Sequence, residues 1–106
     1  MRIELIAFVT GAALACVIAP SVAQNTVVPV TIDNFVFEPV QLTVKVGQTV
    51  TWTNRDDIPH TVVCAGKFRS KTMDTDGTYS FTFTSAGEYK YFCSLHPHMT
   101  GVVKVE

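Results

Sequence analysis

The stretch Leu42-Thr43-Val44-Lys45-Val46-Gly47-Gln48-Thr49-Val50-Thr51-Trp52-Thr53-Asn54 decides the fold class of this chain. Apolar and polar residues alternate through it with a period of two, which is typical of strands with one buried and one exposed face. Gly47 interrupts the alternation as a turn residue would. The stretch therefore predicts two strands joined by a tight turn, with Leu42, Val44 and Val46 facing inward on the first strand and Val50 and Trp52 on the second.

The same alternation recurs after Gln24, in short runs separated by turn-forming residues. Its apolar positions are Val28, Val30 and Ile32, then Tyr79, Phe81 and Phe83, then Tyr89, Tyr91 and Cys93. The helical period is not seen in this part of the sequence. The pattern predicts an all-β sandwich or barrel with roughly seven to eight strands.

The N-terminal segment differs in kind from the rest of the chain. An apolar, nearly uncharged run over residues 5–19 is followed by Ser21-Val22-Ala23, a small-x-small pattern. This indicates a secretory signal peptide over residues 1–23, with cleavage after Ala23, and hence a periplasmic domain over residues 24–106.

Three other readings of the N-terminal segment remain open. A retained membrane anchor would need about 20 apolar residues, and Pro20 and Gln24 interrupt the run. A lipoprotein would be cut before Cys16, since Ala13-Leu14-Ala15-Cys16 loosely resembles a lipidation site. The third is a buried helix of the domain itself. We expect no stable membrane insertion.

Composition bounds the classes of function. The chain has 106 residues, 47% of them hydrophobic and 16% charged, which is typical of one small globular domain. Its formal net charge is −1, so it lacks the basic surface that nucleic acids or anionic membranes attract. Lys67, Arg69 and Lys71 form the one basic cluster, which is either a solvated face or a docking edge for an acidic partner.

Chemistry concentrates in the segment 91–101, where one loop carries a thiol at Cys93, imidazoles at His96 and His98, and a thioether at Met99. Thiolate and thioether are soft ligands and imidazole is borderline, a set that suits copper. Two His and one Cys with a distant axial Met form the blue-copper site of electron-transfer proteins. The chain has three His, so a second His from outside the loop must be His60.

Alternatives to this copper site follow from the same residues. His98 could replace His96, although it directly precedes Met99 and adjacent residues seldom both point inward. Cys64 and Cys93 could instead form a disulfide, as cysteines of exported domains do. Zinc fits poorly, because Met is foreign to the usual zinc ligand sets. Copper enzymes that reduce oxygen or nitrite need further metal centres, so we expect no enzyme.

The segments 34–39, 42–47, 50–54 and 59–62, together with the ligand loop, resemble the cupredoxin family. The similarity is to its amicyanin and bacterial plastocyanin-like members. Two residues separate Cys93 from His96 and two separate His96 from Met99, which is similar to the short amicyanin loop.

This resemblance implies a Greek-key β-sandwich with copper near one end, held by His60, Cys93, His96 and Met99. It also implies that Asn54 ties the His60 loop to the Cys93 loop by hydrogen bonds. The sequence departs from the family at two positions. We expect His98 to be a solvent-facing ring beside the site and Cys64 to be a small buried apolar residue.

The function implied is that of a soluble, monomeric one-electron carrier between periplasmic redox proteins. The family suggests an amine dehydrogenase as donor and a c-type cytochrome as acceptor. His96 would expose its ring edge through an apolar patch that includes Pro59 and Pro97. The alternative function is copper binding without electron shuttling, as in a copper chaperone.

Overall fold

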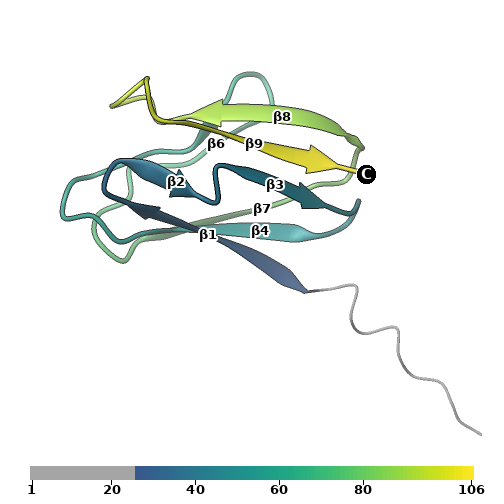
Figure 1. Cartoon of the computed structure of the whole chain (residues 1–106), viewed down its shortest axis with the longest axis horizontal. Helices are drawn as coiled ribbons and strands as arrows, with labels where there is room; N and C mark the ends of the chain where they lie inside the picture. Colours follow the sequence, from purple (N-terminus) through teal and green to yellow (C-terminus); the bar gives the residue numbers. More distant parts are fainter. Residues whose placement is uncertain (1–25) are drawn as a thin grey trace, which may run out of the picture.

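Two β-sheets lie face to face in the computed structural model, which describes residues 26–106 (Figure 1). The first sheet has the strand order β2-β1-β4-β7, with β1 at Val27–Asp33, β2 at Val36–Glu38, β4 at Thr49–Asn54 and β7 at Thr78–Thr82. The second has the order β3-β9-β8-β5-β6, with β3 at Gln41–Val44, β5 at Val63–Cys64, β6 at Phe68–Arg69, β8 at Gly87–Phe92 and β9 at Thr100–Val105.

Both sheets are mixed. β1 pairs in parallel with β4, and β3 pairs in parallel with β9, while the other neighbours are antiparallel. The chain crosses between the sheets after β2, β3, β4, β6 and β7, as in a Greek-key sandwich. The predicted all-β sandwich is therefore confirmed. The described residues form nine strands rather than seven or eight, because β2 and β6 are too short for alternation to reveal them.

The core lies between the sheets and follows the predicted alternation. On β4, Val50 and Trp52 are fully buried, while the Thr residues that alternate with them, at positions 49, 51 and 53, are half-buried. On the outer side, Thr49 and Thr51 form hydroxyl–hydroxyl hydrogen bonds of 2.7 Å to β7. The buried aromatic residues of this core are Phe37, Trp52, Phe68, Phe83 and Tyr91.

Val46 was expected to continue the buried face, and this expectation is wrong. Its side chain is 49% exposed, because β3 ends at Val44 and a turn follows at once. The Lys45 N–H donates to Gln48 Oε1 (2.8 Å), and the Gln48 N–H donates to the Lys45 carbonyl (3.0 Å). Gly47 permits this turn with a φ of 97°.

The predicted signal peptide at residues 1–23 and the possible lipidation at Cys16 lie outside the described residues. Within residues 26–106, the structure contains no helix long and apolar enough to cross a membrane.

One end of the sandwich collects three connections. They are the β1–β2 turn, the β4–β5 loop and the β8–β9 loop, at the end opposite to the C-terminus (Figure 1). The paired strands β1, β4 and β8, β9 hold these connections on rigid supports. Side chains from all three connections meet there.

Candidate metal centre

His60 lies in the β4–β5 connection and is fully buried. Its backbone pairs with that of Met73 in an isolated bridge, through bonds of 3.2 Å from the His60 N–H and 2.8 Å from the Met73 N–H. Pro59 precedes it and fixes one backbone angle of the loop. Both the N–H and the carbonyl of His60 are therefore hydrogen-bonded, which fixes the backbone from which the His60 ring projects.

Asn54 organises the loop that leads to His60. Its amide Nδ2 donates to the carbonyls of Ile58 and Met73, both at 2.9 Å, and its Oδ1 accepts the Asp56 N–H at 2.9 Å. Asn54 was predicted to tie the His60 loop to the Cys93 loop, but none of these hydrogen bonds reaches the Cys93 loop. Asn54 lies at the end of β4, where its side chain reaches the Asp56, Ile58 and Met73 backbones instead.

Thr61 makes the tie that was expected of Asn54. Its backbone N–H donates to Cys93 Sγ at 3.3 Å, and its hydroxyl lies 3.7 Å from the same sulfur. The hydroxyl also accepts the Ser94 N–H and lies 2.8 Å from the Ser94 hydroxyl. The sequence analysis missed Thr61; its position directly after His60 was the one available signal.

Cys93 follows β8 and continues the inward side of that strand. Tyr91 and Cys93 are both buried, as the alternation predicted. The loop from Cys93 to Met99 is closed by its own backbone: the Cys93 N–H donates to the Met99 carbonyl (3.0 Å), the His96 N–H to Cys93 (3.2 Å) and the Met99 N–H to His96 (2.9 Å). Three candidate ligands therefore sit on one hydrogen-bonded loop.

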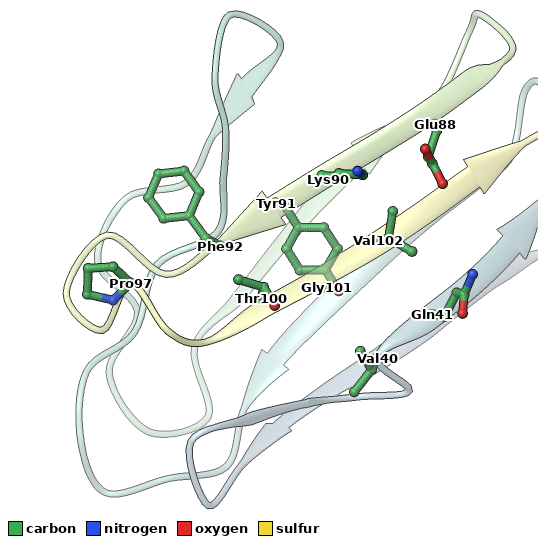
Figure 2. A pocket seen from close by; sticks show the side chains of 10 residues that line it. All are labelled: Val40, Gln41, Glu88, Lys90, Tyr91, Phe92, Pro97, Thr100, Gly101 and Val102. Atoms are coloured by element: carbon green, nitrogen blue, oxygen red, sulfur yellow. The ribbon is translucent and has the colours of Figure 1, made fainter.

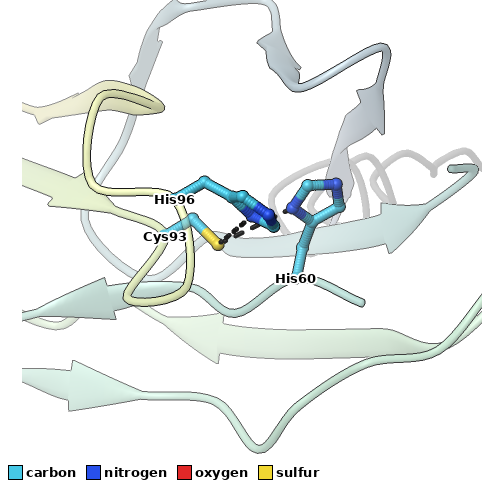
Figure 3. Close-up of side chains that lie close together, drawn as sticks. All are labelled: His60, Cys93 and His96. Carbon is cyan, nitrogen blue, oxygen red and sulfur yellow. Dashed lines mark hydrogen bonds between the residues drawn. The ribbon is translucent and has the colours of Figure 1, made fainter. Parts of the chain in front are cut away.

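Two imidazoles converge on the Cys93 sulfur. His60 Nδ1 and His96 Nδ1 each lie 3.6 Å from Cys93 Sγ, and the three potential ligand atoms lie within 4.8 Å of one another (Figure 3). The His60 and His96 rings contact edge to face with centroids 5.0 Å apart. His60 comes from the β4–β5 loop, and the other two come from the β8–β9 loop.

The Cys93 thiol is prepared for ionisation. Burial alone would raise its pKa, but hydrogen bonds with the Thr61 backbone, the His60 and His96 side chains and the Leu95 backbone together lower the pKa from 9.0 to about 6. Thiolate, rather than thiol, is the form that binds metals. At neutral pH this sulfur is therefore available as a ligand.

The remaining candidate residues, Met99, His98 and Cys64, differ in burial and in their relation to the site. Met99 is buried, at 5% exposure, within the ligand loop. His98 is exposed and stands outside the converging group, as expected. Cys64 is buried and, like Cys93, is a free cysteine, so the alternative disulfide is not formed. Burial raises the pKa of the Cys64 thiol, so this sulfur is kept protonated.

Asp56 lies in the β4–β5 loop and was not among the residues predicted for the site. Its Oδ2 lies 2.8 Å from His60 Nε2, on the side of the ring that faces away from Cys93. Burial would raise the pKa of this carboxyl, but hydrogen bonds from the Phe35 and Asn34 backbones and from His60 lower it overall. Asp56 is therefore a carboxylate, and His60 Nε2 is the donor to it.

The donor set fits copper. A thiolate and two imidazole nitrogens that face one point, with a thioether residue on the same loop, match the soft and borderline ligands that copper prefers. The carboxylate behind His60 is the kind of outer hydrogen-bond acceptor that metal-bound imidazoles require. The residues present are thus suited to hold the ion.

A groove of about 580 Å³ lies elsewhere, on the outer face of the five-stranded sheet (Figure 2). It is lined by Val40, Gln41, Glu88, Lys90, Tyr91, Phe92, Pro97, Thr100, Gly101 and Val102. Pro97 connects its rim to the ligand loop, but His60, Cys93 and His96 do not line it.

Comparison with known proteins agrees with this geometry. The family model described as a cupredoxin-like domain matches residues 5–105. Amicyanin of Paracoccus denitrificans is 44% identical over 94 residues, covering 83% of this chain and 71% of that protein. Amicyanin of Paracoccus versutus is 40% identical over 96 residues, covering 85% and 72%. A solved structure of the Cu(I) form of a mutant amicyanin superposes with a TM-score of 0.72 at 41% identity, covering 74% of this chain and 81% of the other.

Proposed function

We propose that this chain, which belongs to the cupredoxin-like family, is a one-electron carrier that binds copper through His60, Cys93, His96 and Met99. The observation that carries the proposal is the convergence of His60 Nδ1, His96 Nδ1 and Cys93 Sγ within 4.8 Å. The similar amicyanins, one of them solved in a Cu(I) form, support it. When bound, copper would supply the Cu(II)/Cu(I) couple.

The protein's own residues contribute rigidity and charge. His60 is fixed by its bridge to Met73 and by Asp56, and Cys93 is fixed by Thr61. Ligands held on paired strands need little rearrangement when an electron arrives or leaves. This favours a carrier over an enzyme, which would need a place for a substrate at the metal.

Partners would meet the site at its exposed edge. His60 is fully buried, whereas His96 is half-buried, so the His96 ring offers the way to the surface. Exposed apolar residues of the same three connections are Phe35, Ile58, Pro59, Leu95 and Pro97. Such a surface suits brief, small-area docking between redox proteins.

The finer assignments rest on the resemblance and on the N-terminal sequence. We propose an amine dehydrogenase as electron donor and a c-type cytochrome as acceptor. We also propose a periplasmic monomer, exported by residues 1–23 and cleaved after Ala23. Mass spectrometry of the protein purified from a periplasmic extract tests the cleavage site directly.

The function is tested by adding Cu(II) to the purified protein. We expect an intense visible band, a type 1 copper EPR spectrum and reversible one-electron voltammetry. Cys93→Ser should abolish the colour, while Cys64→Ala, which changes the second free cysteine within residues 26–106, should keep it. A wild-type protein that stays colourless with stoichiometric Cu(II) would contradict the proposal. A coloured protein that surrenders its copper rapidly to a chelator would favour the chaperone function.

A further inference from the structure

The β1–β2 turn has an unusual backbone. Asn34 and Phe35 both lie in the left-handed region, with φ of 55° and 61°. Asn tolerates this region, but a bulky aromatic residue is an outlier there. Burial does not explain the conformation, because the Phe35 side chain is 45% exposed. Strained residues that persist in this way are often part of a functional site.

One carboxylate holds this turn. Asp56 Oδ1 accepts the Asn34 N–H at 2.6 Å, and Asp56 Oδ2 accepts the Phe35 N–H at 3.0 Å. The same Oδ2 accepts the His60 Nε2–H at 2.8 Å. Asp56 is itself only 9% exposed, and its own N–H is bound by Asn54. Turn and imidazole are thus joined through a single buried side chain.

The turn places the Phe35 ring against both candidate imidazole ligands. Phe35 meets the His60 ring edge to face at a centroid distance of 5.4 Å and an interplanar angle of 88°. It meets the His96 ring in the same manner at 5.0 Å and 83°. An exposed aromatic ring therefore contacts both imidazoles whose Nδ1 atoms lie 3.6 Å from Cys93 Sγ.

We propose that Asp56 is a positioning residue of the copper site, which fixes His60 through Nε2 and holds the Asn34–Phe35 turn so that Phe35 covers His60 and His96. This inference rests on the proposed function. The carboxylate holds a ring proton of His60 on Nε2, so that Nδ1 is the nitrogen that faces the metal when copper is bound. Phe35 excludes water from the faces of the two rings.

The main test compares Asp56→Ala with Asp57→Ala, an exposed neighbour, in the copper-loaded full-length protein. We expect Asp56→Ala to lose copper to a chelator about ten- to hundred-fold faster and to show altered EPR hyperfine splitting. Asp56→Glu keeps the carboxylate and should recover much of the wild-type behaviour. Asp57→Ala should match the wild type.

Two further measurements keep the inference testable if Asp56→Ala folds poorly. The first is Asp56→Asn, which retains an acceptor for the turn but not a carboxylate for His60. The second is the nitrogen-15 NMR spectrum of the metal-free protein, in which we expect the His60 proton to reside on Nε2 in the wild type and to exchange between both nitrogens in Asp56→Asn.

A third variant isolates the ring. Phe35→Leu should leave the EPR spectrum unchanged and increase the rate of copper loss to a chelator. Wild-type copper retention, EPR and NMR spectra in folded Asp56 variants would overturn the inference and leave the copper carrier intact. If the wild type itself binds no copper, the proposed function fails instead.

Discussion

Thr61 contacts the Cys93 sulfur twice, through its backbone N–H at 3.3 Å and its hydroxyl at 3.7 Å. The two residues come from different loops, 32 positions apart. Hydrogen bonds to a metal-bound thiolate are one means by which a protein sets the redox potential of a copper site. Of these two contacts, only the one from the Thr61 hydroxyl can be removed by a side-chain substitution.

Thr61→Val should lower the reduction potential by roughly 20–60 mV, because a lost hydrogen bond of about 0.5–1.5 kcal/mol no longer stabilises the electron-rich reduced state. Voltammetry of the copper-loaded variant gives the value. Thr61→Ser keeps the hydroxyl and should stay near the wild-type potential. A shift in Thr61→Ser as large as that in Thr61→Val would show that the loss of the hydroxyl is not the cause.

The ionisation of Cys93 should make the metal-free protein sensitive to pH. The pKa of its thiol is about 6 in the folded chain against an ordinary 9.0, so the folded state favours the thiolate. The resulting stabilisation is complete above about pH 9 and is lost as the pH falls through 6. We expect it to be on the order of a few kcal/mol.

Urea unfolding of the metal-free wild type and of Cys93→Ala from pH 6 to pH 9 measures this effect. The free energy of unfolding should rise with pH more steeply in the wild type than in the variant. Parallel curves would mean that the thiol ionises alike in the folded and unfolded chains.

Asn54→Ala should destabilise the protein by about 3 kcal/mol. The Ile58 carbonyl and the Asp56 N–H would lose their side-chain partner, and the Met73 carbonyl would lose one of its two donors. Unpaired buried polar groups are costly. Thermal unfolding measures the loss, and Thr53→Ala, at the preceding position of β4, serves as the control. Equal losses in the two variants would argue against a special role for Asn54.

Gly101→Ala should cost about 1–3 kcal/mol, as overpacking does. A Cβ at this position would lie 2.5 Å from the Cζ and the hydroxyl oxygen of Tyr91. That ring cannot easily move, because it contacts Phe37 and Trp52 at centroid distances of 4.7 Å and 5.4 Å. In a Tyr91→Leu background the same change should cost less. A cost independent of residue 91 would contradict this explanation.

Local patterns in the sequence were sufficient to predict the strands of the sheets and most residues of the candidate site. Val50 and Trp52 alternate with Thr residues, so the inward face of β4 could be predicted. The ligand loop could be predicted because Cys93, His96 and Met99 are close in sequence. His60 followed by elimination, since the chain has three His and the other two belong to the loop.

Contacts between distant loops could not be predicted in this way. Asp56 looks like an ordinary turn residue, and its hydrogen bonds to the β1–β2 turn span 21 and 22 positions. Thr61 offered only its position directly after His60, which does not indicate a contact with Cys93. The prediction for Val46 was wrong for a different reason: the apolar alternation in the sequence continues two residues beyond Val44, where β3 ends and the Lys45–Gln48 turn begins.

The ligand set is divided between loops that meet only in the native fold, with His60 standing 33 positions before Cys93. Unfolding separates these residues while leaving the other loop ligands close in sequence. In the copper-loaded protein, the visible absorption should therefore vanish together with the tertiary structure. The visible absorption band would then serve as an intrinsic optical probe of folding, which can be measured in crude lysates without an added dye.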